Sequence, residues 1–105
     1  MDVTVRPSAV AGTARAPPSK SYSHRAILAA GFADQVRVVD PLMSADTRAT
    51  ARAVEAFGGE VTDADSSLDV TGFYGRRAVP SDVIDCANSG TTMRLTTAAA
   101  ALAAG

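Results

Sequence analysis

One short stretch constrains this chain more than any other: PPSKSYSHR over residues 17–25, which runs directly into the apolar segment AILAA. Two consecutive prolines hold the approach extended and prevent a helix from beginning earlier. Ser19 is a good N-cap, because its hydroxyl can accept a hydrogen bond from an unpaired backbone N–H of the first turn. The stretch therefore predicts a helix from about Lys20 to about Ala33, with Gly31 near its end.

The first turns of this predicted helix carry positive and neutral polar groups. Helix starts expose unpaired N–H groups and the positive end of the helix dipole, so acidic side chains are the usual choice there. Here Lys20, Ser21 and Arg25 supply cationic and hydroxyl groups instead, and Lys20 is the single lysine beside nine arginines. This arrangement predicts a site for an external anion, a phosphate or a carboxylate. His24 is interpreted as a surface or hydrogen-bonded helix histidine rather than a catalytic base.

A second stretch, NSGTTMR over residues 88–94, has the same design. Asn88 or Ser89 can cap a helix, and Gly90 permits a ligand to approach the backbone closely. Two threonine hydroxyls follow. The pattern predicts a second anion-binding helix start, with an ordinary capped helix and a solvated arginine as the alternative.

The two stretches align with each other. Arg94 follows Gly90 by four residues, as Arg25 follows Ser21, so each arginine lies on the same helix face as the residue one turn before it. An Ala/Leu-rich segment, expected to be buried, follows each arginine. The offset of 69 residues indicates an internal repeat.

The rest of the chain alternates between strand and helix patterns. Helices are predicted over residues 20–33, over 47–57 with Ser44 or Asp46 as the cap, and from Ser89 to the end. Strands or extended pieces are predicted over residues 2–6, 13–16, 36–40, 60–62, 68–71 and 83–85, with a loop or edge segment over 72–80 that contains Arg76 and Arg77. The alternation predicts an α/β layer.

Two helices show apolar stripes at helical spacing. In the first, the expected buried residues are Ala26, Ile27, Ala30 and Ala33. In the second, they are Ala49, Ala53, Val54 and Phe57, with Arg48, Arg52 and Glu55 facing solvent. Asp46 and Arg48 are interpreted as capping and solvating this helix.

Composition excludes several classes of function. A net charge of −1 argues against a nucleic-acid surface, and a single histidine and a single cysteine are too few for a metal site. No apolar run reaches transmembrane length, and the first residues do not have the pattern of a signal peptide. The lone Cys86, expected to be a buried small residue, is typical of a reducing compartment, so we expect a cytoplasmic protein without metal or membrane contact.

Residues 17–25 resemble the P-x-S-K-S-x-S-x-R signature of the EPSP synthases, the enolpyruvyl transferases that act on shikimate-3-phosphate. Residues 88–94 resemble the family's N-[AS]-G-T-x-M-R signature, and the segment that opens the second helix is also similar. Ala87 stands where many members have glycine, and Leu95 where some have proline; neither change removes a donor group. The resemblance covers essentially the whole chain but only about the first quarter of a complete enzyme.

The resemblance implies a fold of two domains, each made of three βαβαββ units, of which residues 1–105 form one unit and the start of the next. It implies transfer of the enolpyruvyl group of phosphoenolpyruvate to the 5-hydroxyl of shikimate-3-phosphate, with release of phosphate. The reaction uses no metal or organic cofactor. Members are usually monomeric, so the partner of this chain would be the remainder of the same enzyme, and the chain alone is expected to be inactive.

Carried over position by position, the resemblance places substrates against six residues. Lys20 would contact both phosphoenolpyruvate and shikimate-3-phosphate, which makes it the residue nearest to the chemistry, although no catalytic residue is expected in this chain. Ser21 and Arg25 would bind shikimate-3-phosphate. Asn88 and Gly90 would lie at the phosphoenolpyruvate site, and Arg94 would support that loop.

Three other interpretations stay open at this point. The sister transferase that acts on UDP-N-acetylglucosamine also has a lysine at this helix, but asparagine follows it, so Ser21, Ser23 and Arg25 argue against that family. A non-catalytic anion-binding module on the same scaffold is a different class of function. A purely structural domain leaves the single lysine unexplained.

Overall fold

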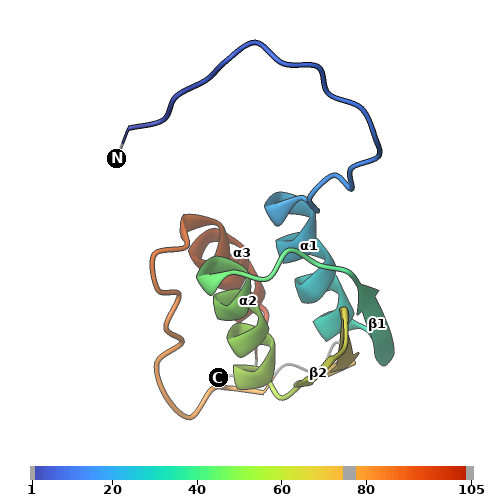
Figure 1. Ribbon diagram of the computed structural model, residues 1–105. Helices are drawn as coiled ribbons and strands as arrows, with labels where there is room; N and C mark the ends of the chain where they lie inside the picture. The colour runs from blue at the N-terminus through green and yellow to red at the C-terminus, as the bar shows by residue number, and fades with distance from the viewer. Residues whose placement is uncertain (1, 75–77, 104–105) are drawn as a thin grey trace.

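The computed structural model describes residues 2–74 and 78–103. The described residues form three helices and a small sheet, preceded by an arm that runs away from them (Figure 1). In chain order, the elements are α1 (Lys20–Phe32), β1 (Gln35–Val39), α2 (Ala45–Ala56), β2 (Glu60–Ala64), β3 (Ser67–Thr71) and α3 (Gly90–Ala100). The predicted mixed α/β fold is confirmed, and each predicted helix begins within two residues of the expected position.

The sheet has the strand order β1-β3-β2, and both neighbours run antiparallel to the central strand β3. Side chains alternate along a strand, so β3 buries Leu68 and Val70, while Asp69 lies on the opposite face. On that outer face Arg37 of β1 lies opposite Asp69, and its Nε donates a hydrogen bond of 2.8 Å to the carboxylate.

The helices form two layers over one face of the sheet. α1 and α2 pack against the strands and against each other, whereas α3 packs against α1 and α2. All three helices begin at the same end of the molecule, at the top of Figure 1, and the sheet lies toward their other ends. The arrangement therefore brings three helix N-termini together, including both starts that the sequence singles out.

The core lies between the sheet and the first helix layer. Ile27 of α1 and Val54, Phe57 and Val70 are fully buried, and Phe73 packs edge-on against Phe57 with ring centroids 6.0 Å apart. The predicted stripe of α2 is confirmed, because Ala49, Ala53, Val54 and Phe57 are all inaccessible to solvent. Its predicted outer residues, Arg48, Arg52 and Glu55, are exposed.

The predicted strands at residues 2–6, 13–16 and 83–85 are wrong. These segments have no strand structure, and Val3, Val5 and Val83 are 78%, 88% and 88% exposed. Alternating side chains form a strand only where a sheet edge supplies hydrogen bonds and an apolar face to cover. These segments do not pair with the described sheet of β1, β3 and β2, so none of them forms the first strand of the expected βαβαββ unit.

Two of the predicted helix faces also need correction. Ala26 of α1 is exposed and Ala33 only half-buried, because the buried face is centred on Ile27 and Ala30 and includes the polar Ser23 and His24. The expected Ala/Leu-rich buried stripe of α3 is wrong as well. α3 packs against two helices along one narrow side, which buries Thr92, Thr96 and Ala99.

Candidate functional site

The start of α1 has the geometry that the sequence predicts. Ser19 is the N-cap in an extended conformation, and its Oγ accepts a hydrogen bond of 3.2 Å from the backbone N–H of Tyr22. The first turn contains no acidic residue. The hydroxyl of Ser23 donates to the carbonyl of Ser19 and accepts from the N–H of Leu42, which ties this turn to the loop after β1.

Lys20 reaches from this first turn to α2. Its Nζ lies 3.0 Å from Oδ2 of Asp46, and its side chain remains 52% exposed. The interpretation of Asp46 as a cap was wrong, because the cap of α2 is Ser44, the other candidate. Arg48, interpreted as solvated, instead makes a two-pronged ion pair with Asp63. The sequence offered no signal for the Lys20–Asp46 pair, since only the packing of α1 on α2 brings these residues together.

Arg25 folds back over the turn before it. Its Nη2 donates to the hydroxyl of Ser21 at 3.0 Å, its Nε donates to the Ser21 carbonyl at 3.3 Å, and its guanidinium lies 4.8 Å from the ring centroid of Tyr22. The side chains of Ser21 and Arg25 are exposed. The predicted pairing of these two residues on one helix face is therefore confirmed, and it leaves guanidinium N–H groups directed toward solvent.

The start of α3 repeats this geometry. Ser89, rather than Asn88, is the N-cap, and its Oγ accepts a hydrogen bond of 3.0 Å from the N–H of Thr92. A Cβ atom placed on Gly90 would have one neighbouring side chain, that of Arg94, at 3.4 Å. Arg94 thus folds back to the first turn of α3, as Arg25 does in α1. Asn88, Gly90 and Arg94 are exposed.

A buried chain of hydrogen bonds connects the three helix starts. Nδ1 of His24 lies 2.6 Å from Oγ1 of Thr50, which lies 2.7 Å from Oγ1 of Thr92. The Thr92 hydroxyl also donates to the backbone carbonyl of Asp46 at 3.2 Å. His24, Thr50 and Thr92 are each at least 98% buried. Sequence reasoning allowed a hydrogen-bonded His24 but missed Thr50, which looks like an ordinary helix residue. It expected the Thr92 hydroxyl to be offered at the anion-binding helix start, whereas this hydroxyl is buried and bonds within the chain.

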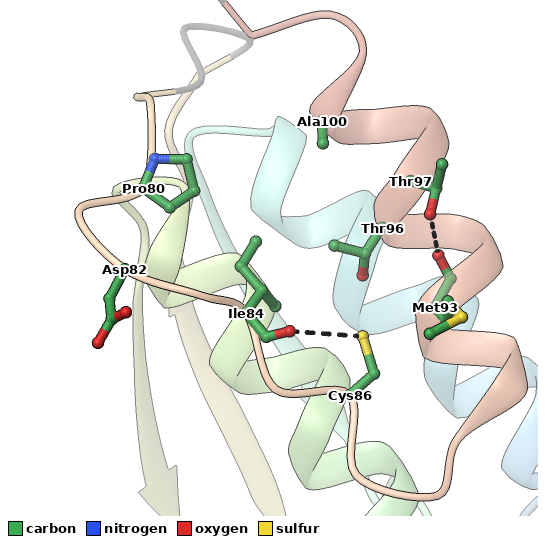
Figure 2. A pocket seen from close by; sticks show the side chains of 8 residues that line it. All are labelled: Pro80, Asp82, Ile84, Cys86, Met93, Thr96, Thr97 and Ala100. Carbon is green, nitrogen blue, oxygen red and sulfur yellow. Dashed lines mark hydrogen bonds between the residues drawn. The ribbon is translucent and has the colours of Figure 1, made fainter.

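A cavity lies away from these groups, between residues 80–86 and the outer side of α3 (Figure 2). Its volume is about 370 Å³, and its lining includes Ile84, Met93 and the half-buried Cys86 but none of the six predicted site residues. The hydroxyl of Thr96 is buried beside it, with no hydrogen-bond partner among the described residues. A mostly apolar lining of this kind does not hold a phosphate.

The described residues contain neither a metal-binding cluster nor a membrane-spanning helix. Among residues 2–74 and 78–103, no group of three or more His, Cys, Asp or Glu side chains is placed to hold a metal ion. In the same part of the chain, no helix combines the length and the apolar character that crossing a bilayer requires.

We predict that stability depends on pH through His24. Burial lowers the pKa of this imidazole below 6.5; the Asp46 carboxylate raises it and the Lys20 ammonium lowers it. Below pH 6.5 the imidazole is protonated in the unfolded chain before it is protonated in the folded chain. Through this group the free energy of unfolding is therefore constant above pH 6.5, and it falls as the pH drops toward the lowered pKa of the folded state. Urea unfolding at pH 7.5, 6.0 and 5.0 measures this, and His24→Asn removes the dependence.

Protonation of Asp63 is expected to lower the stability as well, but at a lower pH than protonation of His24. The hydrogen bond from Arg48 lowers the pKa of Asp63 below 3.8, so its stabilising contribution is present above pH 3.8 and lost below it. A loss of stability that begins only below pH 4, and is unchanged in His24→Asn, would contradict the assignment to His24.

Known proteins resemble this chain in sequence and in structure. The family model for EPSP synthase (3-phosphoshikimate 1-carboxyvinyltransferase) matches residues 5–105. The chain belongs to the EPSP synthase family.

Relatives and solved structures agree with this membership. The chain is 67% identical to the 3-phosphoshikimate 1-carboxyvinyltransferase of Natronomonas pharaonis and 68% identical to that of Halobacterium salinarum, over its whole length in both cases. EPSP synthase from Acinetobacter baumannii matches 79% of this chain and 20% of its own length, with a TM-score of 0.70 and 30% identity. The chain spans 24% of the Natronomonas relative, so it corresponds to about a quarter of that EPSP synthase.

Proposed function

We propose that the protein to which this chain contributes transfers the enolpyruvyl group of phosphoenolpyruvate to the 5-hydroxyl of shikimate-3-phosphate and releases phosphate. The observation that carries the proposal is that two serine-capped, cationic helix starts lie at one end of the molecule and are joined through α2. Both substrates are phosphorylated anions, and each helix start offers N–H groups and an arginine to one of them.

Lys20 is suited to contact both substrates. An ammonium group has three N–H donors, and Asp46 occupies one of them at 3.0 Å. Two donors remain, and the half-exposed side chain can direct them into the space in front of α1 and α3. A positive charge shared by two anions that repel each other lowers the energy of holding them together.

The other predicted site residues divide between the two substrates according to the helix on which they lie. Ser21 and Arg25 of α1 bind shikimate-3-phosphate, whereas Asn88 and Gly90 of α3 lie at the phosphoenolpyruvate site with Arg94 in support. The remainder of the enzyme supplies the residues that exchange protons. The proposal includes a cytoplasmic, monomeric enzyme without a cofactor, to which residues 1–105 contribute one repeat unit and the beginning of the next.

A hybrid enzyme tests the proposal. This chain replaces the matching first quarter of the Natronomonas pharaonis relative, to which it is 67% identical. We expect the hybrid to release phosphate only when phosphoenolpyruvate and shikimate-3-phosphate are both present. Turnover with UDP-N-acetylglucosamine would assign the chain to the sister activity. Binding of both anions without turnover, in a folded hybrid, would favour the non-catalytic module.

Replacing Arg25 with alanine in this hybrid is expected to raise the KM for shikimate-3-phosphate. A charged hydrogen bond contributes about 1.5–3 kcal/mol, so the increase is roughly 10- to 150-fold. The KM for phosphoenolpyruvate is expected to change far less, because Arg25 hydrogen-bonds to Ser21 in the first turn of α1 and is proposed to bind shikimate-3-phosphate. Initial rates with one substrate varied at a time give both constants. Equal increases in the two KM values would contradict the assignment of Arg25 to one substrate.

A further inference from the structure

The buried hydrogen-bond chain has one possible direction. The backbone carbonyl of Asp46 can only accept, so the single hydrogen of the Thr92 hydroxyl points toward it. Thr92 must therefore accept from Thr50, whose own hydrogen is then used. Thr50 in turn must accept from Nδ1 of His24, which consequently carries a proton. Each donor in the series has one acceptor, and the imidazole has the Nδ1–H form.

This directed series links the groups that hold the two anions. His24 lies one turn after Lys20 on α1, and Thr92 lies in the capped first turn of α3. Thr50 of α2 stands between them, and the series ends on the backbone of Asp46, whose side chain holds Lys20. The links of 2.6 and 2.7 Å are buried, where hydrogen bonds are strong and an unpaired member is costly.

We propose that Thr50, together with His24 and Thr92, is a positioning residue that sets the distance between the α1 and α3 helix starts, and so between the two reacting substrates. The proposal rests on the proposed enolpyruvyl transfer. The site has two halves, the start of α1 and the start of α3. The geometry within each half is determined by neighbouring residues of one helix, namely its serine cap and its arginine. The distance between the two helix starts depends on how α1, α2 and α3 pack together, and the hydrogen bonds through Thr50 are buried polar contacts that cross this packing from α1 to α3.

The hybrid enzyme with Thr50→Val tests this role, because valine keeps the shape of the side chain and removes the hydroxyl. A small displacement of reacting groups can reduce turnover by about two orders of magnitude. We expect kcat to fall roughly 10- to 100-fold, while both KM values stay within about threefold, since each anion site remains intact. Thr50→Ser, which restores the hydroxyl, is expected to recover most of the loss.

Two control variants separate positioning from stability. Thr97→Val removes a threonine hydroxyl from α3 that donates only to the carbonyl of Met93, outside the series, and kcat is expected to stay unchanged. Val70→Ala truncates a fully buried side chain on β3. Rates are normalised to folded protein. A fall in kcat in Val70→Ala equal to that in Thr50→Val, or a failure of Thr50→Ser to recover, would overturn the positioning role.

A measurement independent of turnover tests the series itself. The ¹⁵N chemical shifts of the imidazole distinguish a protonated Nδ1 from a protonated Nε2, and we expect the Nδ1–H form at pH 7.5 in the hybrid. In Thr50→Val we expect the backbone amide signals of Lys20 and Thr91 to shift together. An Nε2–H imidazole, or a shift on one helix only, would overturn the inference. If the hybrid without substitutions is inactive but shows the Nδ1–H imidazole and the joint amide shifts, the proposed function is rejected, whereas the hydrogen-bonded connection between α1 and α3 is retained.

Discussion

Replacing Lys20 with methionine is expected to lower kcat/KM of the hybrid enzyme by about 10²- to 10³-fold. This is the size of effect seen when an enzyme loses one hydrogen-bond donor directed at negative charge in the transition state. Methionine keeps a long unbranched stem and removes only the ammonium. We expect both KM values to rise as well, because Lys20 is proposed to contact both anions. Steady-state kinetics with each substrate varied in turn measures the loss.

Part of that loss has a second cause. Without Lys20, the carboxylate of Asp46 has lost its ion-pair partner at 3.0 Å, and under the proposed function it would repel the bound anions. The double variant Lys20→Met with Asp46→Asn removes this repulsion, so it is expected to recover a part of the rate but not most of it. Full recovery would mean that Lys20 serves only to neutralise Asp46.

The histidine reports whether Lys20 lies where the structure places it. The Lys20 ammonium lowers the pKa of His24, so its removal in Lys20→Met is expected to raise that pKa. An NMR titration of the imidazole measures the change without any substrate. An unchanged His24 pKa would contradict the position of Lys20, independently of its role in turnover.

Replacing Gly72 with alanine is expected to give the largest loss of stability. A Cβ atom at this position would lie 2.0 Å from the carbonyl oxygen of Ala33 and 2.6 Å from that of Gly31. Both are backbone atoms, so no side-chain rotation relieves the overlap. The segment must move, which breaks the hydrogen bonds that the N–H of Gly72 donates to the carbonyl of Asp34 and the N–H of Phe73 donates to the carbonyl of Gly31. We expect a cost of about 3 kcal/mol.

Native-state hydrogen exchange in the hybrid enzyme measures this cost locally. The amides of Val70 and Phe73 are expected to exchange on the order of 100-fold faster in Gly72→Ala, which corresponds to that free energy. Gly90→Ala is the matched control, because a Cβ there meets only a flexible arginine at 3.4 Å. Equal exchange rates in the two variants would contradict the close packing at Gly72.

Local patterns predicted most of the helices and strands. The prolines and Ser19 defined where α1 begins, and the spacing of Ala49, Ala53, Val54 and Phe57 defined the buried side of α2 correctly. These features depend on a few neighbouring residues, namely caps, helix breakers and side-chain periodicity. Residues 2–6 were predicted as a strand from their alternation alone, and this prediction was wrong because these residues do not pair with the described sheet.

The sequence by itself determined the two cationic helix starts, because a cap, its following turn and an arginine four residues later are all local. Tertiary structure alone decided how the two starts are held together. The Lys20–Asp46 pair and the series through Thr50 and Thr92 join residues that are at least 26 positions apart in the chain. Contacts at such separations arise only when α1, α2 and α3 pack side by side, and no local pattern encodes that packing.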